Sequence, residues 1–391
     1  MNHTITRSNF LEAMGLGLVS IAITEKLFAG LRLRGDSDER TLFIGTYTKE
    51  KSEGIYRGRL DLTSGSLRIE SAAKGITNPS FLAIDRSRGR LFAVNETAEY
   101  DGKPGGSVSA FSIDSKTGDL RLVNRQSSRG ADPCHLTLDN SGRFVLVANY
   151  SGGNVAVLPV HNDGTLGEAT DVVQHQGSSV TARQLAPHPH SVNVDASGNF
   201  VYVPDLGIDK VMIYRFDGKG GKLLPATPGW AGLKAGAGPR HMVFHPDGQK
   251  AYVLNELDSM LTLFAVDRST GALDQRQAIS TVPRDFAGKN YPADIHIAPS
   301  GKFIYCSNRG HDSIAVFAVD GKTGELSTLQ HQPTKGQWPR NFTIDQTGRY
   351  LLVANQRSDT ITVFSIGQKG GTLSPTDQQV ELPVPVCLKF L

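Results

Sequence analysis

One spacing recurs six times along this chain of 391 residues, and it constrains the fold more than any other feature. Each copy starts with a proline, and alternating apolar residues follow it after a gap of two. A tight turn, usually opened by Asp, then leads into a second apolar stretch. Sixteen residues after each proline stands an asparagine or, once, an aspartate. The six pairs are Pro79 and Asn95, Pro133 and Asn149, Pro189 and Asp205, Pro239 and Asn255, Pro292 and Asn308, and Pro339 and Asn355. Six copies with one internal spacing indicate a repeat protein.

Each copy is expected to supply four strands. After the first two come a third stretch rich in β-branched and aromatic residues and a fourth that opens with Gly-x-Leu. Alternating apolar residues bounded by Gly, Asp and Pro are typical of strands joined by short turns. Four strands in about 50 residues are typical of a β-propeller blade. The third strands are expected at Ser107–Asp114, Asn154–Val160, Lys210–Phe216, Met260–Asp267, Ser313–Asp320 and Thr360–Gly367.

The two ends of the chain supply a seventh copy. Pro385–Phe390 repeats the first strand, Leu42–Tyr47 the second and Gly54–Asp61 the third. A blade built from both termini closes the ring and leaves no free sheet edge. We therefore expect an all-β fold, a seven-bladed β-propeller of four-stranded blades, over residues 41–391. This is one domain, although the length alone suggests two or three.

Residues 1–40 differ from the repeats and are expected to form a leader. An apolar run from Leu16 to Ile23 follows Arg7, as in an export signal, but it is too short to span a membrane. The segment Thr6–Leu11 resembles a twin-arginine signal that lacks its second arginine, and Glu12 interrupts the apolar stretch. Two alternatives remain open: export to the periplasm, or a cytoplasmic protein with a disordered or amphipathic leader.

The composition argues against several classes of protein. Lys and Arg number 41 against 38 Asp and Glu, with no block of either sign, so a nucleic-acid partner is not expected. The three cysteines, Cys134, Cys306 and Cys387, cannot all pair, and none belongs to a metal-binding spacing. No P-loop, dinucleotide fingerprint or GxSxG elbow opens a helix. We expect no metal and no cofactor, and the sequence does not indicate an oligomeric state.

The repeat also predicts where a functional site lies. In a propeller blade the first strand lines the channel and pairs antiparallel with the second, so the start of one lies beside the end of the other. Positions one, two, sixteen and seventeen after each proline are therefore expected to ring one mouth of the channel. The repeated asparagine suggests a structural role in bonding backbone, while its neighbours vary, as in a binding site on a symmetric scaffold. The candidate substrate-binding residues are His135, Asn149, Tyr150, Asp205, His241, Asp294 and Arg340.

Five segments of this ring carry a family resemblance. They are Ala148–Gly153, Pro187–Val192, Gly238–His241, Leu254–Glu256 and Ser307–Gly310. Together they resemble the seven-bladed lactonase family, which includes bacterial 6-phosphogluconolactonases and fungal carboxy-muconate lactonising enzymes. The resemblance implies a propeller that opens or closes a lactone at the channel mouth without a metal. Carried over by motif, it implies four catalytic residues: His190, Arg240, Glu256 and Arg309.

The chemistry of these side chains suits lactone hydrolysis, which needs a base to activate water and a cation to stabilise the oxyanion. We expect Glu256 to be the base, with His190 as an alternative base or proton shuttle. Arg240 and Arg309 are expected to bind the carbonyl oxygen, a phosphate or a carboxylate. The expected function is a hydrolase that opens a small-molecule sugar lactone such as 6-phosphogluconolactone. A muconate-type lactonising isomerase, an exported binding propeller without activity, and a merely structural Arg240–Glu256 pair stay open as alternatives.

Overall fold

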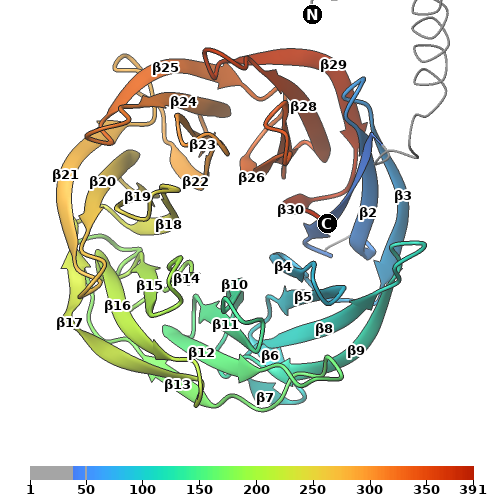
Figure 1. Cartoon of the computed structure of the whole chain (residues 1–391), viewed down its shortest axis with the longest axis vertical. Coiled ribbons are helices and arrows are strands. Elements are labelled where there is room, and N and C mark those ends of the chain that lie inside the picture. The colour runs from blue at the N-terminus through green and yellow to red at the C-terminus, as the bar shows by residue number, and fades with distance from the viewer. Residues whose placement is uncertain (1–37, 49–50) are drawn as a thin grey trace, which may run out of the picture. The chain divides into compact units, whose positions relative to one another are not determined.

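The propeller expected from the repeats is present. A computed structural model describes residues 38–48 and 51–391, and within these ranges the chain forms strands and no helix. Seven four-stranded antiparallel sheets surround a central channel (Figure 1). None of the described residues forms a helix that could cross a membrane. The leader expected at residues 1–40 lies outside the described residues, apart from its last three.

The first three blades follow one another along the chain, each with its first strand nearest the channel. Blade 1 contains β4 (Leu82–Asp85), β5 (Arg90–Asn95), β8 (Ser107–Ile113) and β9 (Leu120–Ser127), and the hairpin of β6 (Glu99–Tyr100) and β7 (Lys103–Pro104) lies between β5 and β8. Blade 2 contains β10 (Pro133–Leu138), β11 (Phe144–Asn149), β12 (Asn154–Pro159) and β13 (Asp171–Gln174). Blade 3 contains β14 (Asn193–Val194), β15 (Phe200–Asp205), β16 (Lys210–Asp217) and β17 (Lys222–Gly232).

The remaining blades repeat this order, except that the last takes its first strand from the C-terminal end. Blade 4 contains β18 (Pro239–Phe244), β19 (Lys250–Asn255), β20 (Met260–Val266) and β21 (Leu273–Ser280). Blade 5 contains β22 (Tyr291–Ile297), β23 (Phe303–Arg309), β24 (Ser313–Val319) and β25 (Leu326–Pro333). Blade 6 contains β26 (Pro339–Ile344), β27 (Tyr350–Asn355), β28 (Thr360–Ile366) and β29 (Leu373–Glu381), and blade 7 contains β30 (Pro385–Phe390), β1 (Glu39–Thr46), β2 (Gly54–Asp61) and β3 (Leu67–Lys74).

Blade 7 closes the ring as predicted. Its innermost strand β30 pairs antiparallel with β1, from Leu42 opposite Phe390 to Thr46 opposite Pro385. Leu388 is fully buried against Leu42 and Ile44 in the apolar cluster between blades 6 and 7. Because each blade packs on both neighbours, second strands such as β11 are buried along their whole length.

The repeated asparagine has the structural role that the sequence suggests. The Nδ2 group of Asn95 donates to the carbonyl of Thr77 (2.8 Å), that of Asn149 to Ser128 (2.8 Å) and that of Asn308 to Thr281 (2.7 Å). Each acceptor lies in the connection that enters the same blade from the preceding one. The asparagine therefore ties a blade to its incoming connection, and this explains its fixed distance from the proline.

Candidate active site

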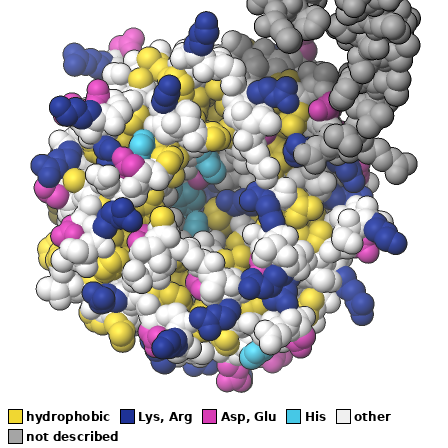
Figure 2. Space-filling model, in the orientation of Figure 1, with side chains coloured by type: hydrophobic (Ala, Val, Ile, Leu, Met, Phe, Trp, Pro, Cys, Tyr) yellow, Lys and Arg dark blue, Asp and Glu magenta, His cyan; other side chains and the backbone are white. Residues whose placement is uncertain are grey.

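A hollow lies at the centre of the ring, and histidine side chains gather inside it (Figure 2). The predicted pairing that builds this mouth is present: Pro239 lies opposite Asn255, and Pro339 opposite Asn355. A small cavity here takes its lining from blades 1, 2, 4, 6 and 7, and it includes Ser80, Phe81, Glu96, Cys134, Arg240, His241, Arg340, Asn341 and Val386.

Three β-bulges aim extra side chains into the mouth. In β18 the register shifts between Pro239 and His241, which leaves Arg240 as the extra residue, and β10 and β26 repeat the irregularity at Cys134 and Arg340. Neighbouring side chains on a regular strand point to opposite faces, but a bulge changes this direction locally. Arg240 and His241 therefore line the same cavity although they are adjacent in sequence.

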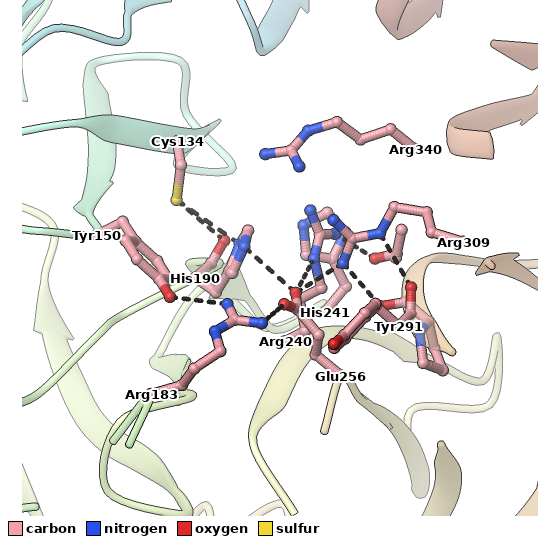
Figure 3. Close-up of polar contacts among 12 residues, drawn as sticks. Cys134, Tyr150, Arg183, His190, Arg240, His241, Glu256, Tyr291, Arg309 and Arg340 are labelled. Atoms are coloured by element: carbon pink, nitrogen blue, oxygen red, sulfur yellow. Dashed lines mark hydrogen bonds and ion pairs between the residues drawn. The ribbon is translucent and has the colours of Figure 1, made fainter. Parts of the chain in front are cut away.

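Glu256 is the centre of a buried cluster of charges (Figure 3). Its Oε2 atom lies 3.0 Å from Arg240 Nε and 2.8 Å from Arg309 Nη2, and its Oε1 atom accepts a hydrogen bond of 2.7 Å from Arg183 Nη1. The Glu256 side chain is only 3% exposed. Three guanidinium groups from three parts of the chain thus converge on one carboxylate.

This environment determines the protonation state of Glu256. Burial on its own raises the pKa of the carboxyl, but Arg309, Arg240 and Arg183 together outweigh it and hold the pKa well below its usual range. Both carboxylate oxygens also accept from guanidinium groups. Glu256 is therefore a stable anion with little basicity.

His190 lies beside this cluster. Its Nε2 atom is 3.9 Å from Glu256 Oε2, and its Nδ1 atom is 3.6 Å from Cys134 Sγ. Burial and the charge of Arg240 lower the pKa of His190 well below 6.5, so the ring is neutral at pH 7. Burial raises the pKa of the Cys134 thiol, which keeps the sulfur protonated.

His135, His241 and Asp294 form a second group in the channel. The ring centroids of His135 and His241 are 5.3 Å apart, and His241 Nδ1 lies 2.9 Å from Asp294 Oδ1. His296 Nε2 lies 3.1 Å from the other oxygen of Asp294. Burial and Arg240 lower the pKa of His241 to about 4, although the Asp294 contact opposes this. His135, His241 and Asp294, which the sequence analysis names as candidates, thus lie together, and His241 lines the cavity at the mouth.

Arg340 faces the cluster from the other side of the mouth (Figure 3). Its Nη2 atom donates to Tyr47 Oη (3.0 Å), and that hydroxyl lies 2.9 Å from both carboxylate oxygens of Glu96. In the described part of the chain, this is the one hydrogen bond that the Arg340 guanidinium makes. Its other N–H groups can therefore serve a ligand.

Two of the predicted binding residues lie elsewhere. Asn149 and Asp205 are fully buried. Asn149 bonds Ser128 and Asn154, while Asp205 accepts from His175 Nδ1 (2.6 Å) and from the backbone amide of His188 (2.7 Å). Both side chains bond within or between blades and do not face the mouth. Tyr150 does face it, because its hydroxyl accepts a hydrogen bond of 3.1 Å from Arg183.

Arg183 is the residue that the sequence reasoning missed. It lies in residues 175–192, which connect β13 to β14, and it precedes the repeat proline Pro189. The available signal was the interval from Pro133 to Pro189, which at 56 residues is the longest between repeat prolines. Among the described residues, no group of three or more His, Cys, Asp or Glu side chains is arranged to hold a metal ion. That the reaction needs no cofactor stays a prediction.

The fold and this cluster define a class of protein: a seven-bladed propeller with an arginine-rich site at one mouth of its channel. The family model described as "Lactonase, 7-bladed beta-propeller" matches residues 41–390, and the chain belongs to this family. The resemblance of the five motif segments is thereby confirmed.

Individual relatives agree with this assignment. The chain is 37% identical over 349 residues to the 6-phosphogluconolactonase of Bacillus subtilis. The aligned residues cover 89% of this chain and 97% of that protein. The 6-phosphogluconolactonase of Formosa agariphila is 33% identical over 302 residues, 76% of this chain and 84% of that protein. The solved structure of the periplasmic gluconolactonase of Pseudomonas aeruginosa matches with a TM-score of 0.86 at 36% identity, covering 90% of this chain and 99% of that one.

Proposed function

We propose that this protein hydrolyses a sugar lactone at the arginine-rich mouth, with 6-phosphogluconolactone as the first substrate to test. The observation that carries the proposal is the convergence of Arg183, Arg240 and Arg309 on Glu256 beside a neutral His190. Such a site supplies positive charge for a developing oxyanion and a base for water. Membership of the lactonase family and the names of the curated relatives support the same reaction.

We infer that His190, and not Glu256, is the base. Glu256 is the base expected from the sequence, but both of its oxygens already accept hydrogen bonds from guanidinium groups. The neutral His190 ring contacts Cys134 Sγ through Nδ1, and within the described residues its Nε2 atom makes no hydrogen bond, so the lone pair of Nε2 is available to a water molecule. Once Nε2 takes a proton from the attacking water, the resulting imidazolium faces the Glu256 carboxylate, which stabilises it. The proton then passes to the ring oxygen as the C–O bond breaks, which gives the open hydroxy acid.

Arg240 and Arg309 have the remaining donors for the oxyanion. Arg240 uses Nε on Glu256 and Nη1 on the carbonyl of Ala293, while Arg309 uses Nε and Nη2 on protein oxygens. Within the described residues, Arg240 Nη2 and Arg309 Nη1 make no hydrogen bond. Glu256 thus holds two guanidinium groups in place while these donors stay available for a carbonyl oxygen that gains charge.

An unphosphorylated gluconolactone is the second candidate substrate. The structural match to a periplasmic gluconolactonase favours it, and a leader at residues 1–40 that directs export would place the enzyme away from sugar phosphates. The shared chemistry is a six-membered lactone, so both substrates use the same site.

The test is hydrolysis of freshly prepared 6-phosphogluconolactone and glucono-1,5-lactone by the full chain, with spontaneous opening subtracted. Arg240→Gln removes a guanidinium of the cluster. Arg276→Gln is the matched control, because Arg276 lies on the outer strand β21 and pairs with Asp274 away from the mouth. Turnover that is lost only in Arg240→Gln supports the proposal. Wild-type protein that opens neither lactone above background refutes it.

A further inference from the structure

The connection between blades 2 and 3 carries the one mouth arginine that does not come from a strand. Residues 175–192 separate β13 from β14, whereas three to ten residues join the other blades. Arg183 lies within this segment, and its guanidinium reaches Glu256 and Tyr150 (Figure 3). The ring of Tyr291 lies 5.9 Å away on another blade.

Hydrogen bonds to Asp209 hold the segment around Arg183 in place. The Asp209 side chain accepts from Gln184 Nε2 (2.7 Å) and from the backbone amides of Gly236 and Gly238 (both 2.7 Å). Gln184, the neighbour of Arg183, is fully buried and also donates to the carbonyl of Leu206 (2.9 Å). The connection that carries Arg183 is therefore held in place by hydrogen bonds before a ligand arrives. Less conformational entropy of this connection is then lost when a ligand binds to Arg183.

Arg183 differs from the other two arginines of the cluster in its exposure. Its side chain is 45% exposed, against 3% for Arg240 and 6% for Arg309. The guanidinium has five N–H groups, and two of them make the hydrogen bonds to Glu256 and Tyr150. The other three have no hydrogen-bond partner in residues 38–48 and 51–391. Arg183 thus lies at the rim, with donors that a ligand can reach from solvent.

The mouth as a whole carries excess positive charge. Four arginines, Arg183, Arg240, Arg309 and Arg340, face three carboxyl groups, Glu256, Glu96 and Asp294. At least one positive charge therefore lacks a carboxylate partner. Burying cations without a counter-charge is costly, so an anionic ligand is the natural complement of this mouth. Phosphate esters suit the planar fork of arginine especially well.

We propose that Arg183 recognises the phosphate of a phosphorylated lactone and so decides between phosphorylated and neutral substrates. The inference rests on the proposed function. The deeper Arg240 and Arg309 meet the reacting carbonyl, and the phosphate, carried on the exocyclic carbon beside the ring oxygen, then points toward the rim. Arg183 binds it with its outward N–H groups while the contact with Glu256 keeps the guanidinium oriented.

The experiment compares Arg183→Gln, Arg183→Lys and the control Arg276→Gln on 6-phosphogluconolactone and glucono-1,5-lactone. Arg183→Gln is expected to raise KM for the phosphorylated lactone roughly 10- to 100-fold, the effect of losing a charge-assisted hydrogen bond. Any loss through the contact of Arg183 with Glu256 affects both lactones equally, so the ratio of kcat/KM for the phosphorylated lactone to kcat/KM for the neutral lactone should fall by roughly 10-fold or more. The KM of Arg183→Lys for the phosphorylated lactone should lie between those of the wild type and Arg183→Gln, because lysine keeps the positive charge but lacks the planar fork of donors.

Equal losses on both lactones would overturn the assignment, since they would mean that Arg183 acts through Glu256 on the reaction itself. Unchanged kinetics on both would overturn it as well. Wild-type protein that opens only the neutral lactone would remove the phosphate assignment and leave the lactonase proposal standing. If it opens neither, both are refuted. Calorimetric titration with 6-phosphogluconate and gluconate supplies a second readout, in which only the phosphorylated acid should lose affinity in Arg183→Gln.

Discussion

Replacing Glu256 by glutamine keeps the shape of the side chain and removes its charge. The change leaves Arg240 and Arg309 without their anion, and their side chains are only 3% and 6% exposed. Removing one partner of a buried ion pair costs about 3–5 kcal/mol, because the other charge stays buried without compensation. We therefore expect Glu256→Gln to lower the free energy of unfolding by roughly this amount.

This loss translates into a measurable melting temperature. A domain of about 350 residues has an unfolding entropy of roughly 0.7 kcal/mol per kelvin, from about 2.1 cal/mol/K per residue. A loss of about 3–5 kcal/mol then lowers Tm by about 4–7 °C. Turnover should fall in the same variant, since the two inner arginines are no longer held for the oxyanion.

Differential scanning calorimetry at pH 7 measures the stability change, and initial rates on the better lactone measure turnover. The double variant Glu256→Gln/Arg309→Gln serves as the control for charge. It removes one of the cations that were left unpaired, and it should therefore be less destabilised than the sum of the two single variants. A Tm of Glu256→Gln within about 1 °C of the wild-type value would refute the expected destabilisation, because it would mean that solvent already screens the charges of the cluster.

Three further predictions concern the channel and the ring. His190→Gln should lower kcat by roughly 10²- to 10⁴-fold, the usual contribution of a general base, with little change in Tm; unchanged kcat would exclude His190 as the base. The pKa of His241, about 4 in the folded protein against about 6.5 unfolded, makes the unfolded chain bind the proton first as the pH falls. Stability present above pH 6.5 should therefore be lost toward pH 4, by about 3 kcal/mol, and urea unfolding of His241→Asn should show a correspondingly flatter pH dependence. Deletion of Pro385–Leu391 exposes the edge of β1 and should give aggregation on size-exclusion chromatography; a monomer with wild-type Tm would contradict the closure argument.

Most of the fold was predictable because its signals are local and repeated. The strands expected at Gly54–Asp61 and Pro385–Phe390 coincide with β2 and β30, and the third strand expected at Met260–Asp267 differs from β20 by one residue. Proline, the Asp turn and glycine punctuate each copy at the same positions. Six repetitions make such a pattern far more reliable than any single copy.

The site was predictable only in part. Strand pairing puts Arg240 near Glu256, and the repeat alone is enough to expect that contact. Arg183 belongs to no repeat, so no spacing relates it to Glu256, 73 residues away. The low basicity of Glu256 could not be predicted from the sequence either, because it depends on how many guanidinium groups surround the carboxylate in the folded protein. For Asn149 and Asp205 the repeat predicts a place at the mouth, but their side chains bond within or between blades. The repeat gives the position of the backbone, and it does not determine whether the side chain points to solvent or to neighbouring backbone.

The pairing of Leu42 with Phe390 joins residues that are 348 positions apart in the chain. On a ribosome, β1 to β3 emerge first and wait with an unpaired edge until the last strand has been made. Domains usually fold as their residues emerge, and contacts this distant in sequence form slowly. The ring can therefore close only after β30 has been made, and until then the nascent chain has at most six complete blades and three strands of the seventh.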